Sequence, residues 1–383
     1  MDAMDSHPTR ALIDRSAFRH NLSCVRSYCA GSVKVMAVVK ADAYGHGVIE
    51  LSRVALAAGA GALAVARVDE ALAIREAGIT APILVFELPP EPMVESALAA
   101  RVDLTAGTAA GAVSISRCAG RLGRKAVVHA KVDTGMGRLG FHWATAAREI
   151  EAAVRLPRLE LAGVYSHFAT AEDPDKRFAQ IQVERFIEVV ESLRRKGIAV
   201  PLRHMANSGA IVTMPDAHFD MVRPGIMLYG YMPAHGVEER FPVRPVLTLR
   251  SAIAQVKTVE QGTPVSYGGR YVTASRTAIA TVPIGYADGY ARRLTGHAQA
   301  LVKGKRYPVV GTICMDHCML DCGPDPDCGP GDDVVLIGRS GEASISAWDV
   351  ADALGTIPYE VTCQISPRVR REFLPDFMPG KGG

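Results

Sequence analysis

Short apolar runs alternate with longer amphipathic segments over the first two thirds of the chain. The apolar runs occupy residues 33–39, 62–66, 83–86, 102–105, 126–132, 161–167, 202–206 and 221–228. In segment 177–196, Phe178, Phe186 and Val189 belong to a set of apolar residues spaced by three or four, which predicts an amphipathic helix. Strands that alternate with helices predict a parallel sheet, and this number of repeats predicts a (β/α)8 TIM-type barrel.

The pattern changes after Tyr231. A join containing Pro233, Pro242 and Pro245 is followed by strand-like segments and one helical segment. The strand-like segments are 246–259, 278–283, 307–313 and 334–337, and the helical segment is 346–354. We therefore expect a barrel over residues 12–240 and a mainly β C-terminal domain over residues 241–383. Segment 11–14 precedes the first barrel unit, and it either begins the barrel or pairs with the β domain.

Composition favours a globular protein of two domains, because 383 residues with 48% hydrophobic and 22% charged residues exceed one average core. The net charge of +3 gives no reason to expect a nucleic acid or a membrane as partner, but it allows a small anionic ligand. Residues 1–10 lack the apolar core of a signal peptide, and the apolar run 55–66 is too short to span a bilayer. We expect a cytoplasmic protein.

The eight cysteines are expected to be free thiols. Cys318, Cys322 and Cys328 lie near His317, but their spacing matches no paired-cysteine metal site. We therefore expect no metal, and the role of this cluster stays open.

Polar residues follow several of the predicted strands, at the end where barrels carry their active groups. These residues are Lys40 after the first strand, Lys131, Asp133 and Arg138 after the fifth, His167 at the end of the sixth, Asn207 and Ser208 after the seventh, and Arg223 in the eighth. A lysine at a strand end is more often a surface charge than a catalytic group. However, burial would lower the pKa of Lys40, and a neutral amine suits Schiff-base chemistry with an aldehyde cofactor.

The phosphate of such a cofactor needs hydrogen-bond donors. Ser208 and Gly225 follow the last two predicted strands, where barrels commonly bind phosphate. Asn207 and Ser208 are also typical of an ordinary helix N-cap. A phosphate site and a helix cap can coexist, because the backbone amides at a capped helix start can also bind a phosphate. If a pyridine nitrogen lay against Arg223, the guanidinium would keep it unprotonated. The ring would then be a weaker electron sink, which favours racemisation over transamination.

The chain resembles the bacterial alanine racemases. The similar motifs occur in family order from about residue 11 to residue 370. They are Lys40-Ala-Asp-Ala-Tyr44-Gly-His46-Gly47, Lys131-Val-Asp-Thr-Gly-Met-Gly-Arg138, Ser166-His167-Phe168, Asn207-Ser208, Arg223-Pro-Gly-Ile226, Ser-Tyr267-Gly, Tyr286-Ala-Asp-Gly, Cys-Met315-Asp316 and Pro358-Tyr359-Glu. The tail at 366–371 departs from the family pattern, which weakens any inference about that segment.

The resemblance implies a pyridoxal 5'-phosphate enzyme that interconverts L-alanine and D-alanine and supplies D-alanine for peptidoglycan. Lys40 would carry the cofactor and act as one base, and Tyr267 from the other subunit of a homodimer would be the opposing base. The resemblance also implies that the cofactor phosphate is contacted by Tyr44, Ser208, Gly225, Ile226 and Tyr359. Arg223 would contact the pyridine nitrogen, and Asn207 and Arg138 would contact the cofactor elsewhere. The substrate would be held by Arg138, Met315 and Tyr286, and Lys131 would be carbamylated. His167 would link Tyr267 to Arg223.

Three alternatives stay open. The first is a racemase of serine or of a broader set of amino acids. A decarboxylase of the same cofactor fold would normally present an acid to the pyridine nitrogen, so Arg223 argues against it. A non-catalytic carrier of the cofactor would lack the second domain, in which Tyr267 and Met315 lie.

Overall fold

The structure is a computed structural model and describes residues 7–236 and 241–375. The chain divides into two compact units. The barrel unit comprises Phe18–Ala43 and Val48–Arg244, and the β unit comprises Met1–Ala17, Tyr44–Gly47 and Pro245–Gly383. The domain ranges expected from the sequence, 12–240 and 241–383, include residues 237–240 and 376–383, which lie outside the described residues.

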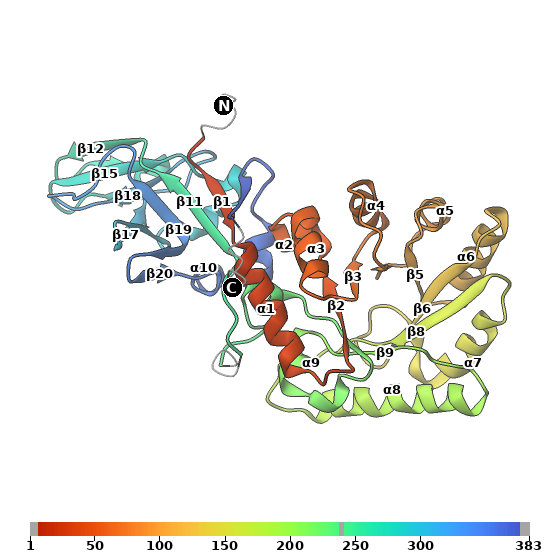
Figure 1. Cartoon of the computed structure of the whole chain (residues 1–383). Coiled ribbons are helices and arrows are strands. Elements are labelled where there is room, and N and C mark those ends of the chain that lie inside the picture. Colours follow the sequence, from red (N-terminus) through yellow and green to blue (C-terminus); the bar gives the residue numbers. More distant parts are fainter. Residues whose placement is uncertain (1–6, 237–240, 376–383) are drawn as a thin grey trace, which may run out of the picture. The chain divides into compact units, whose positions relative to one another are not determined.

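Eight parallel strands close into a barrel within the described part of the barrel unit, which confirms the predicted fold class (Figure 1). In the order of the sheet they are β5 (Asp103–Ala106), β4 (Ile83–Val85), β3 (Ala62–Val65), β2 (Lys34–Val38), β10 (Met221–Val222), β9 (Arg203–His204), β8 (Leu159–Tyr165) and β6 (Ala126–Asp133). Pairing of β5 with β6 closes the ring, and the short β7 (Phe141–His142) adds to β6.

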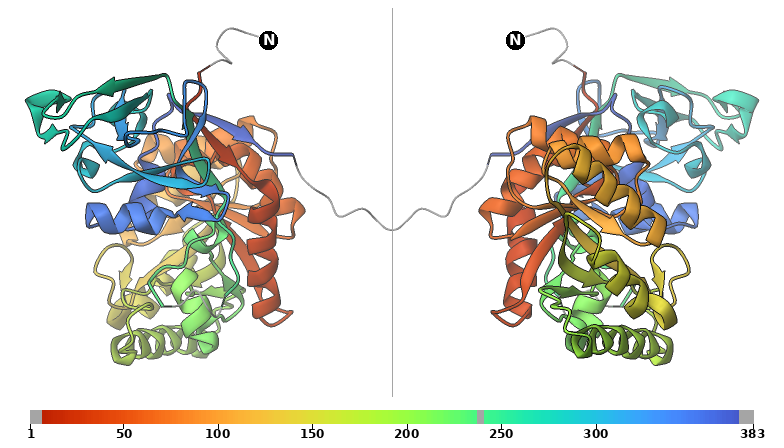
Figure 2. Two further views of the ribbon diagram at one scale, coloured as in Figure 1. Left: turned by 90° about the vertical axis from the view of Figure 1, so that its left-hand side faces the viewer. Right: turned by 90° about the vertical axis from the view of Figure 1, so that its right-hand side faces the viewer.

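Amphipathic helices lie on the outer side of these strands (Figures 1 and 2). They are α1 (Arg15–Tyr28), α3 (Val48–Ala57), α4 (Val68–Glu76), α5 (Glu91–Ala99), α6 (Ala109–Arg121), α7 (Trp143–Val154) and α8 (Arg177–Arg195). The bounds of α8 agree closely with the predicted helix at 177–196. Phe186, Val189 and Leu193 of this helix are buried, whereas its charged residues face outward.

The eighth strand is shorter than predicted. The apolar run 221–228 forms a strand only over β10 (Met221–Val222) and then the 3-10 helix η3 (Ile226–Tyr229). Pro224 interrupts the run because it has no amide hydrogen, although its carbonyl still accepts a hydrogen bond from Val38 N–H at 3.0 Å. Arg223 therefore follows the strand, and His167 likewise lies beyond the end of β8. Lys131 and Asp133, in contrast, belong to β6 itself.

The β unit contains a mainly antiparallel sheet (Figure 1). Its path is β12 (Gln255–Val259), β15 (Thr277–Val282), β18 (Cys318–Asp321), β17 (Lys305–Val310), β16 (Gln299–Val302), β19 (Asp333–Ser340), β11 (Leu247–Ala252), β1 (Arg10–Ile13) and β21 (Arg370–Phe373), with β20 (Ala343–Ile345) paired to β19. A separate hairpin joins β13 (Pro264–Val265) to β14 (Tyr271–Val272). The helices are α10 (Ala347–Leu354) and α11 (Pro358–Cys363).

One detail differs from the predicted segments of this unit, because the single run 246–259 is divided into β11 and β12. Of the two alternatives for segment 11–14, the structure shows pairing with the β domain, since β1 pairs with β11 and β21. None of the helices within residues 7–236 and 241–375 combines the length and hydropathy that a membrane crossing requires.

Candidate active site

Lys40 begins a strained turn directly after the buried end of β2. The turn, α2 (Lys40–Gly45), has φ values of 52° to 55° from Ala41 to Tyr44, so it is left-handed. Left-handed helical geometry costs about 1–2 kcal/mol per non-glycine residue. A carboxylate oxygen of Glu70 accepts a hydrogen bond from Ala41 N–H at 2.5 Å, and Asp42 Oδ1 accepts one from Val48 N–H at 2.8 Å. These bonds offset part of the strain and fix the backbone next to Lys40.

Arg223 lies at the C-terminal end of β10 with 3% of its surface exposed. Its Nη2 donates to the carbonyls of Ser166 and Met205 at 2.7 and 3.2 Å, and its Nη1 lies 3.1 Å from His204 Nδ1. Within residues 7–236 and 241–375, Arg223 forms no ion pair with a carboxylate. The hydrogen bonds described above use Nη1 and Nη2 and leave out Nε. Burial lowers the pKa of Arg223 to about 10, so the guanidinium stays protonated at neutral pH.

Two buried imidazoles support Arg223 from inside the barrel. His129 Nδ1 lies 2.9 Å from His204 Nε2. The ring of Tyr165 stacks on His204 with a centroid separation of 4.9 Å, and the Arg223 guanidinium lies 5.3 Å from the centroid of the same ring. Burial and then the charge of Arg223 lower the pKa of His129 to about 4 and hold that of His204 well below its usual range.

Lys131 is a buried amine on β6 whose Nζ has no hydrogen-bond partner in the described chain. Nζ lies 4.9 Å from the centroid of the Tyr165 ring. Burial, followed by the charges of Arg223 and Arg138, holds the pKa of Lys131 well below its ordinary value. Burial at this position therefore favours the neutral form of the amine. Arg138 itself lies exposed on the loop after β6, where Asp133 Oδ1 accepts hydrogen bonds from two backbone amides of that loop.

Basic side chains from four segments lie near His167. The pKa of His167 is well below its usual range, because of burial and then the charges of Arg223, Lys131, Arg138 and Lys40. His167 Nδ1 lies 3.4 Å from Arg223 Nη2. The fold therefore gathers the predicted residues of strands one, five, six and eight at one mouth. The positive field favours a ligand that carries negative charge.

The residues after the seventh and eighth strands are joined by a hydrogen bond from Gly225 N–H to Ser208 Oγ at 2.9 Å. Ser208 begins α9 (Ser208–Thr213), and Gly225 precedes Ile226 at the start of η3. Asn207 caps α9, since its Oδ1 accepts from Ala210 N–H at 2.9 Å. The cap interpretation is thus correct, and the same arrangement holds the starts of two helices together in a form suited to a phosphate.

Two tyrosines expected at the phosphate also lie together, although they are far apart in the sequence. The rings of Tyr44 and Tyr359 have a centroid separation of 5.9 Å and an interplanar angle of 47°. Gly45 follows Tyr44 at a close approach of two backbones, because a Cβ atom there would lie 2.2 Å from the carbonyl oxygen of Thr362. This contact requires glycine at position 45.

The remaining predicted residues lie on the surface of the β unit. Tyr267, Met315 and Tyr286 are 70%, 52% and 41% exposed, which is unusual for large apolar residues. Tyr267 and Met315 line an open depression of about 600 Å³ together with Ser266, Cys314 and Asp316. Tyr286 N–H donates to the Cys314 carbonyl at 3.1 Å, so Tyr286 adjoins this depression. A tyrosine hydroxyl and a flexible side chain are therefore presented together at one surface.

Several residues of the site are not among those predicted from the sequence. Glu70, Tyr165, His129 and His204 were not singled out, although His129 and His204 are polar residues inside apolar strands, and that signal could have found them. In the described ranges no three metal-ligating side chains come together. The cluster of Cys318, Cys322 and Cys328 consists of free thiols.

Both parts of the chain match domains of known proteins. Residues 13–233 match the family model of the alanine racemase N-terminal domain, and residues 246–373 match that of the C-terminal domain. The alanine racemase of Carboxydothermus hydrogenoformans is 43% identical over 96% of this chain and 100% of its own length. The solved alanine racemase of Clostridium difficile 630 has a TM-score of 0.92 at 39% identity, with 96% of each chain covered. A histidine racemase from Leuconostoc mesenteroides has a TM-score of 0.88 at 27% identity, with 97% of this chain and 99% of that chain covered.

Proposed function

Because the chain belongs to the alanine racemase family, an isomerase family, we propose that it interconverts L-alanine and D-alanine with pyridoxal 5'-phosphate held by Lys40. The product would supply D-alanine for peptidoglycan. The observation that carries this proposal is the group of basic side chains around His167, in which Arg223 Nη2 lies 3.4 Å from His167 Nδ1. Lys131, Arg138 and Lys40 also lie near enough to lower the pKa of His167. Such a field suits a cofactor phosphate and a substrate carboxylate, and it places an amine suited to aldehyde chemistry beside them.

The barrel residues and two tyrosines of the β unit have side chains that suit this cofactor. Lys40 would carry it, while Tyr44, Ser208, Gly225, Ile226 and Tyr359 would bind its phosphate, and Asn207 and His167 would complete the pocket. The Ser208–Gly225 hydrogen bond and the Tyr44–Tyr359 ring contact support the phosphate assignment. When bound, the cofactor supplies an electron sink that makes the Cα proton of an amino acid acidic.

Arg223 would face the pyridine nitrogen. Carbonyl and imidazole partners occupy its two terminal nitrogens and leave Nε–H for another acceptor. A guanidinium donates a hydrogen bond without giving up its proton, so the nitrogen opposite it stays unprotonated. Arg223 therefore limits the strength of the electron sink and favours return of a proton to Cα.

Racemisation needs a proton donor and acceptor on each face of a planar carbon. We assign one face to Lys40 and the other to the partner subunit's Tyr267. The exposure of Tyr267, Met315 and Tyr286 on one surface supports this assignment, because a second chain of a homodimer could cover them. In this assignment residues 12–240 bind the cofactor together with Tyr359 of the same chain, and Tyr267, Met315 and Tyr286 of residues 241–383 serve the neighbouring subunit.

Arg138 would bind the substrate carboxylate, helped by the partner's Met315 and the partner's Tyr286. Lys131 would become a carbamate, since burial favours the neutral form of its unpartnered amine, and a neutral amine can attack carbon dioxide and release one proton. The resulting anion would pair with Arg138 and hold it in place. Incubation with ¹³C-labelled bicarbonate tests this step, because the wild type should show a carbamate carbon signal that Lys131→Arg lacks.

Chiral chromatography on purified protein tests the activity. L-Alanine should be converted to the racemate faster than L-serine or L-histidine at equal concentration, and the reverse reaction should reach the same end point. A faster reaction with serine or histidine would favour a racemase of another or broader specificity. Stoichiometric cofactor without any racemisation would favour a carrier.

Borohydride labelling tests the cofactor lysine. Reduction should fix the cofactor on Lys40, and peptide mapping identifies the labelled residue. Lys131 is the main competing candidate, because burial lowers the pKa of its amine. A label on the Lys131 peptide, or on any other lysine, would contradict the assignment.

A further inference from the structure

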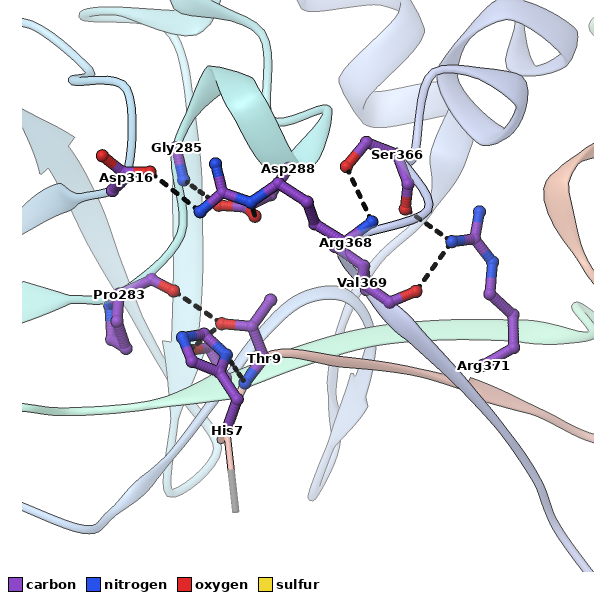
Figure 3. Close-up of polar contacts among 11 residues, drawn as sticks. His7, Thr9, Pro283, Gly285, Asp288, Asp316, Ser366, Arg368, Val369 and Arg371 are labelled. Atoms are coloured by element: carbon purple, nitrogen blue, oxygen red, sulfur yellow. Dashed lines mark hydrogen bonds and ion pairs between the residues drawn. The ribbon is translucent and has the colours of Figure 1, made fainter. Parts of the chain in front are cut away.

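The side chain of Arg368 contacts Asp288 and Asp316, which lie in two different loops of the β unit (Figure 3). Its Nη2 donates to Asp316 Oδ1 at 2.9 Å, and its Nε lies 3.4 Å from Asp288 Oδ1. Asp316 directly follows Met315, and Asp288 closes η6 (Tyr286–Asp288). One guanidinium therefore holds one carboxylate from each loop.

The two loops are also joined through their backbones. Tyr286 N–H and Ala287 N–H donate to the carbonyls of Cys314 and Met315 at 3.1 and 3.0 Å. A Cβ atom at Gly285 would lie 2.3 Å from both of these carbonyl oxygens, so only glycine fits there. The loops consequently move as one body, and a displacement of either Asp288 or Asp316 would move both Tyr286 and Met315.

The turn before β21 fixes the direction of Arg368. Arg371 donates to the carbonyls of Ile365, Ser366 and Val369 at 2.6, 2.6 and 2.7 Å, which closes the turn around its guanidinium (Figure 3). Ser366 N–H donates to the Asp288 carbonyl at 3.0 Å. The tail that departs from the family pattern in sequence thus forms a rigid support for Arg368.

Burial differs across the Arg368 contacts. The side chain of Asp288 is 6% exposed, whereas those of Arg368 and Asp316 are 54% and 47% exposed. The Arg368–Asp316 pair is exposed on both sides, and such pairs contribute little to global stability. Asp288 Oδ2 accepts from Gly285 N–H at 3.0 Å, so its other oxygen depends on Arg368 for a charged partner. Loss of Arg368 would leave a buried carboxylate oxygen poorly paired and favour a local shift of the loop.

We propose that Arg368 is a positioning residue, which sets the location of Tyr286 and Met315 through Asp288 and Asp316. The proposal rests on the proposed function, in which these two residues hold the substrate of the neighbouring subunit. The fork of a guanidinium can hold two carboxylates in fixed directions, whereas a lysine ammonium acts as a point charge. The identity of the side chain, and not only its charge, therefore matters.

The test compares Arg368→Met and Arg368→Lys with the control Arg276→Met, which removes an exposed arginine that pairs with Glu260 in the same unit. We expect Arg368→Met to lower kcat/KM for alanine by about 10- to 100-fold, mainly through KM, since a misplacement near 1 Å can cost about 100-fold. Arg368→Lys should recover part of this loss, and Arg276→Met should match the wild type. All three should keep nearly the wild-type Tm.

Hydrogen exchange on the holoenzyme supplies a readout independent of activity. In Arg368→Met the amides of Tyr286 and Ala287 should exchange at least about tenfold faster than in the wild type, while amides of β15 stay unchanged. A double-mutant cycle with Asp316→Asn should be non-additive, because both changes break the same contact.

Unchanged exchange at Tyr286 and Ala287, or a KM of Arg368→Met within about twofold of the wild type, overturns the proposal. If Arg368→Met does not fold, the same measurements on Arg368→Lys test the proposal. The ammonium of lysine acts as a point charge, so this variant should also raise KM measurably. A wild type that racemises no amino acid refutes the proposed function instead, and the exchange experiment then still tests the positioning role.

Discussion

His129 Nδ1 lies 2.9 Å from Nε2 of His204, and both rings are buried in the barrel. Arg223 can only donate, so His204 Nδ1 accepts from Arg223 and His204 Nε2 carries the hydrogen that it donates to His129. This assignment makes both imidazoles neutral. A proton added to either ring would break a hydrogen bond or place a second cation beside Arg223.

This arrangement predicts a loss of stability in acid. The pKa of His129 is about 4 in the folded chain, below its ordinary value of 6.5. Its contribution to the free energy of unfolding is therefore complete above pH 6.5 and declines as the pH falls towards 4, by up to about 3 kcal/mol. Urea denaturation at pH 7.5 and pH 4.5 should show that the stability difference between the wild type and His129→Asn shrinks in acid. His297→Asn, which removes an exposed imidazole, is the control, and an equal difference at both pH values would contradict the tautomer assignment.

The second prediction concerns Tyr267. Tyr267→Phe removes only a hydroxyl on an exposed ring, so the fold and cofactor content should be retained. Loss of one acid–base group typically costs about 10²- to 10⁴-fold in rate. The rate of hydrogen isotope exchange at Cα should fall by different factors for L-alanine and D-alanine, because each base acts on one face of the Cα atom. Tyr271→Phe provides a control on the same unit, since its hydroxyl bonds Asp321 instead. Near-normal rates in both directions would remove Tyr267 from the mechanism.

The third prediction concerns assembly. If each site uses Lys40 of one subunit and the partner subunit's Tyr267, Lys40→Ala and Tyr267→Phe chains are inactive alone but complement each other. In the mixed dimer one site carries both lesions and the other carries neither, so activity should return. Native mass spectrometry measures the fraction of mixed dimer. A mixed dimer without activity would place both bases in one chain.

The fourth prediction concerns Arg223. Arg223→Glu should slow racemisation and raise transamination, because a carboxyl group in place of the guanidinium favours protonation of a pyridine nitrogen. The carbonyls of Ser166 and Met205 would face the new side chain, so we also expect a lower Tm. The ratio of pyruvate to D-alanine formed, per bound cofactor, does not depend on the amount of folded protein. Arg223→Lys keeps a cation and should leave that ratio near the wild-type value. An unchanged ratio in Arg223→Glu would refute the electronic role.

The sequence determined the architecture because periodicity is a local property. Runs of apolar residues predicted all eight barrel strands, and the spacing of Phe186, Val189 and Leu193 predicted α8 almost to its ends. The eighth strand was overestimated, since apolar character does not report that Pro224 interrupts strand pairing. Motifs also predicted which residues would gather at the barrel mouth, because parallel strands of a barrel all end on one side.

Only the tertiary structure decided how these residues are held. Three contacts each join segments that are distant in the sequence. They are the bond from Ala41 N–H to Glu70 at the turn after Lys40, the His129–His204 pair behind Arg223, and the contacts of Arg368 with Asp288 and Asp316. Hydrogen-bond partners and burial depend on which strands and loops become neighbours, and no local pattern contains that information. The sequence therefore determined the chemical groups of the site, whereas folding determined their charge states and positions.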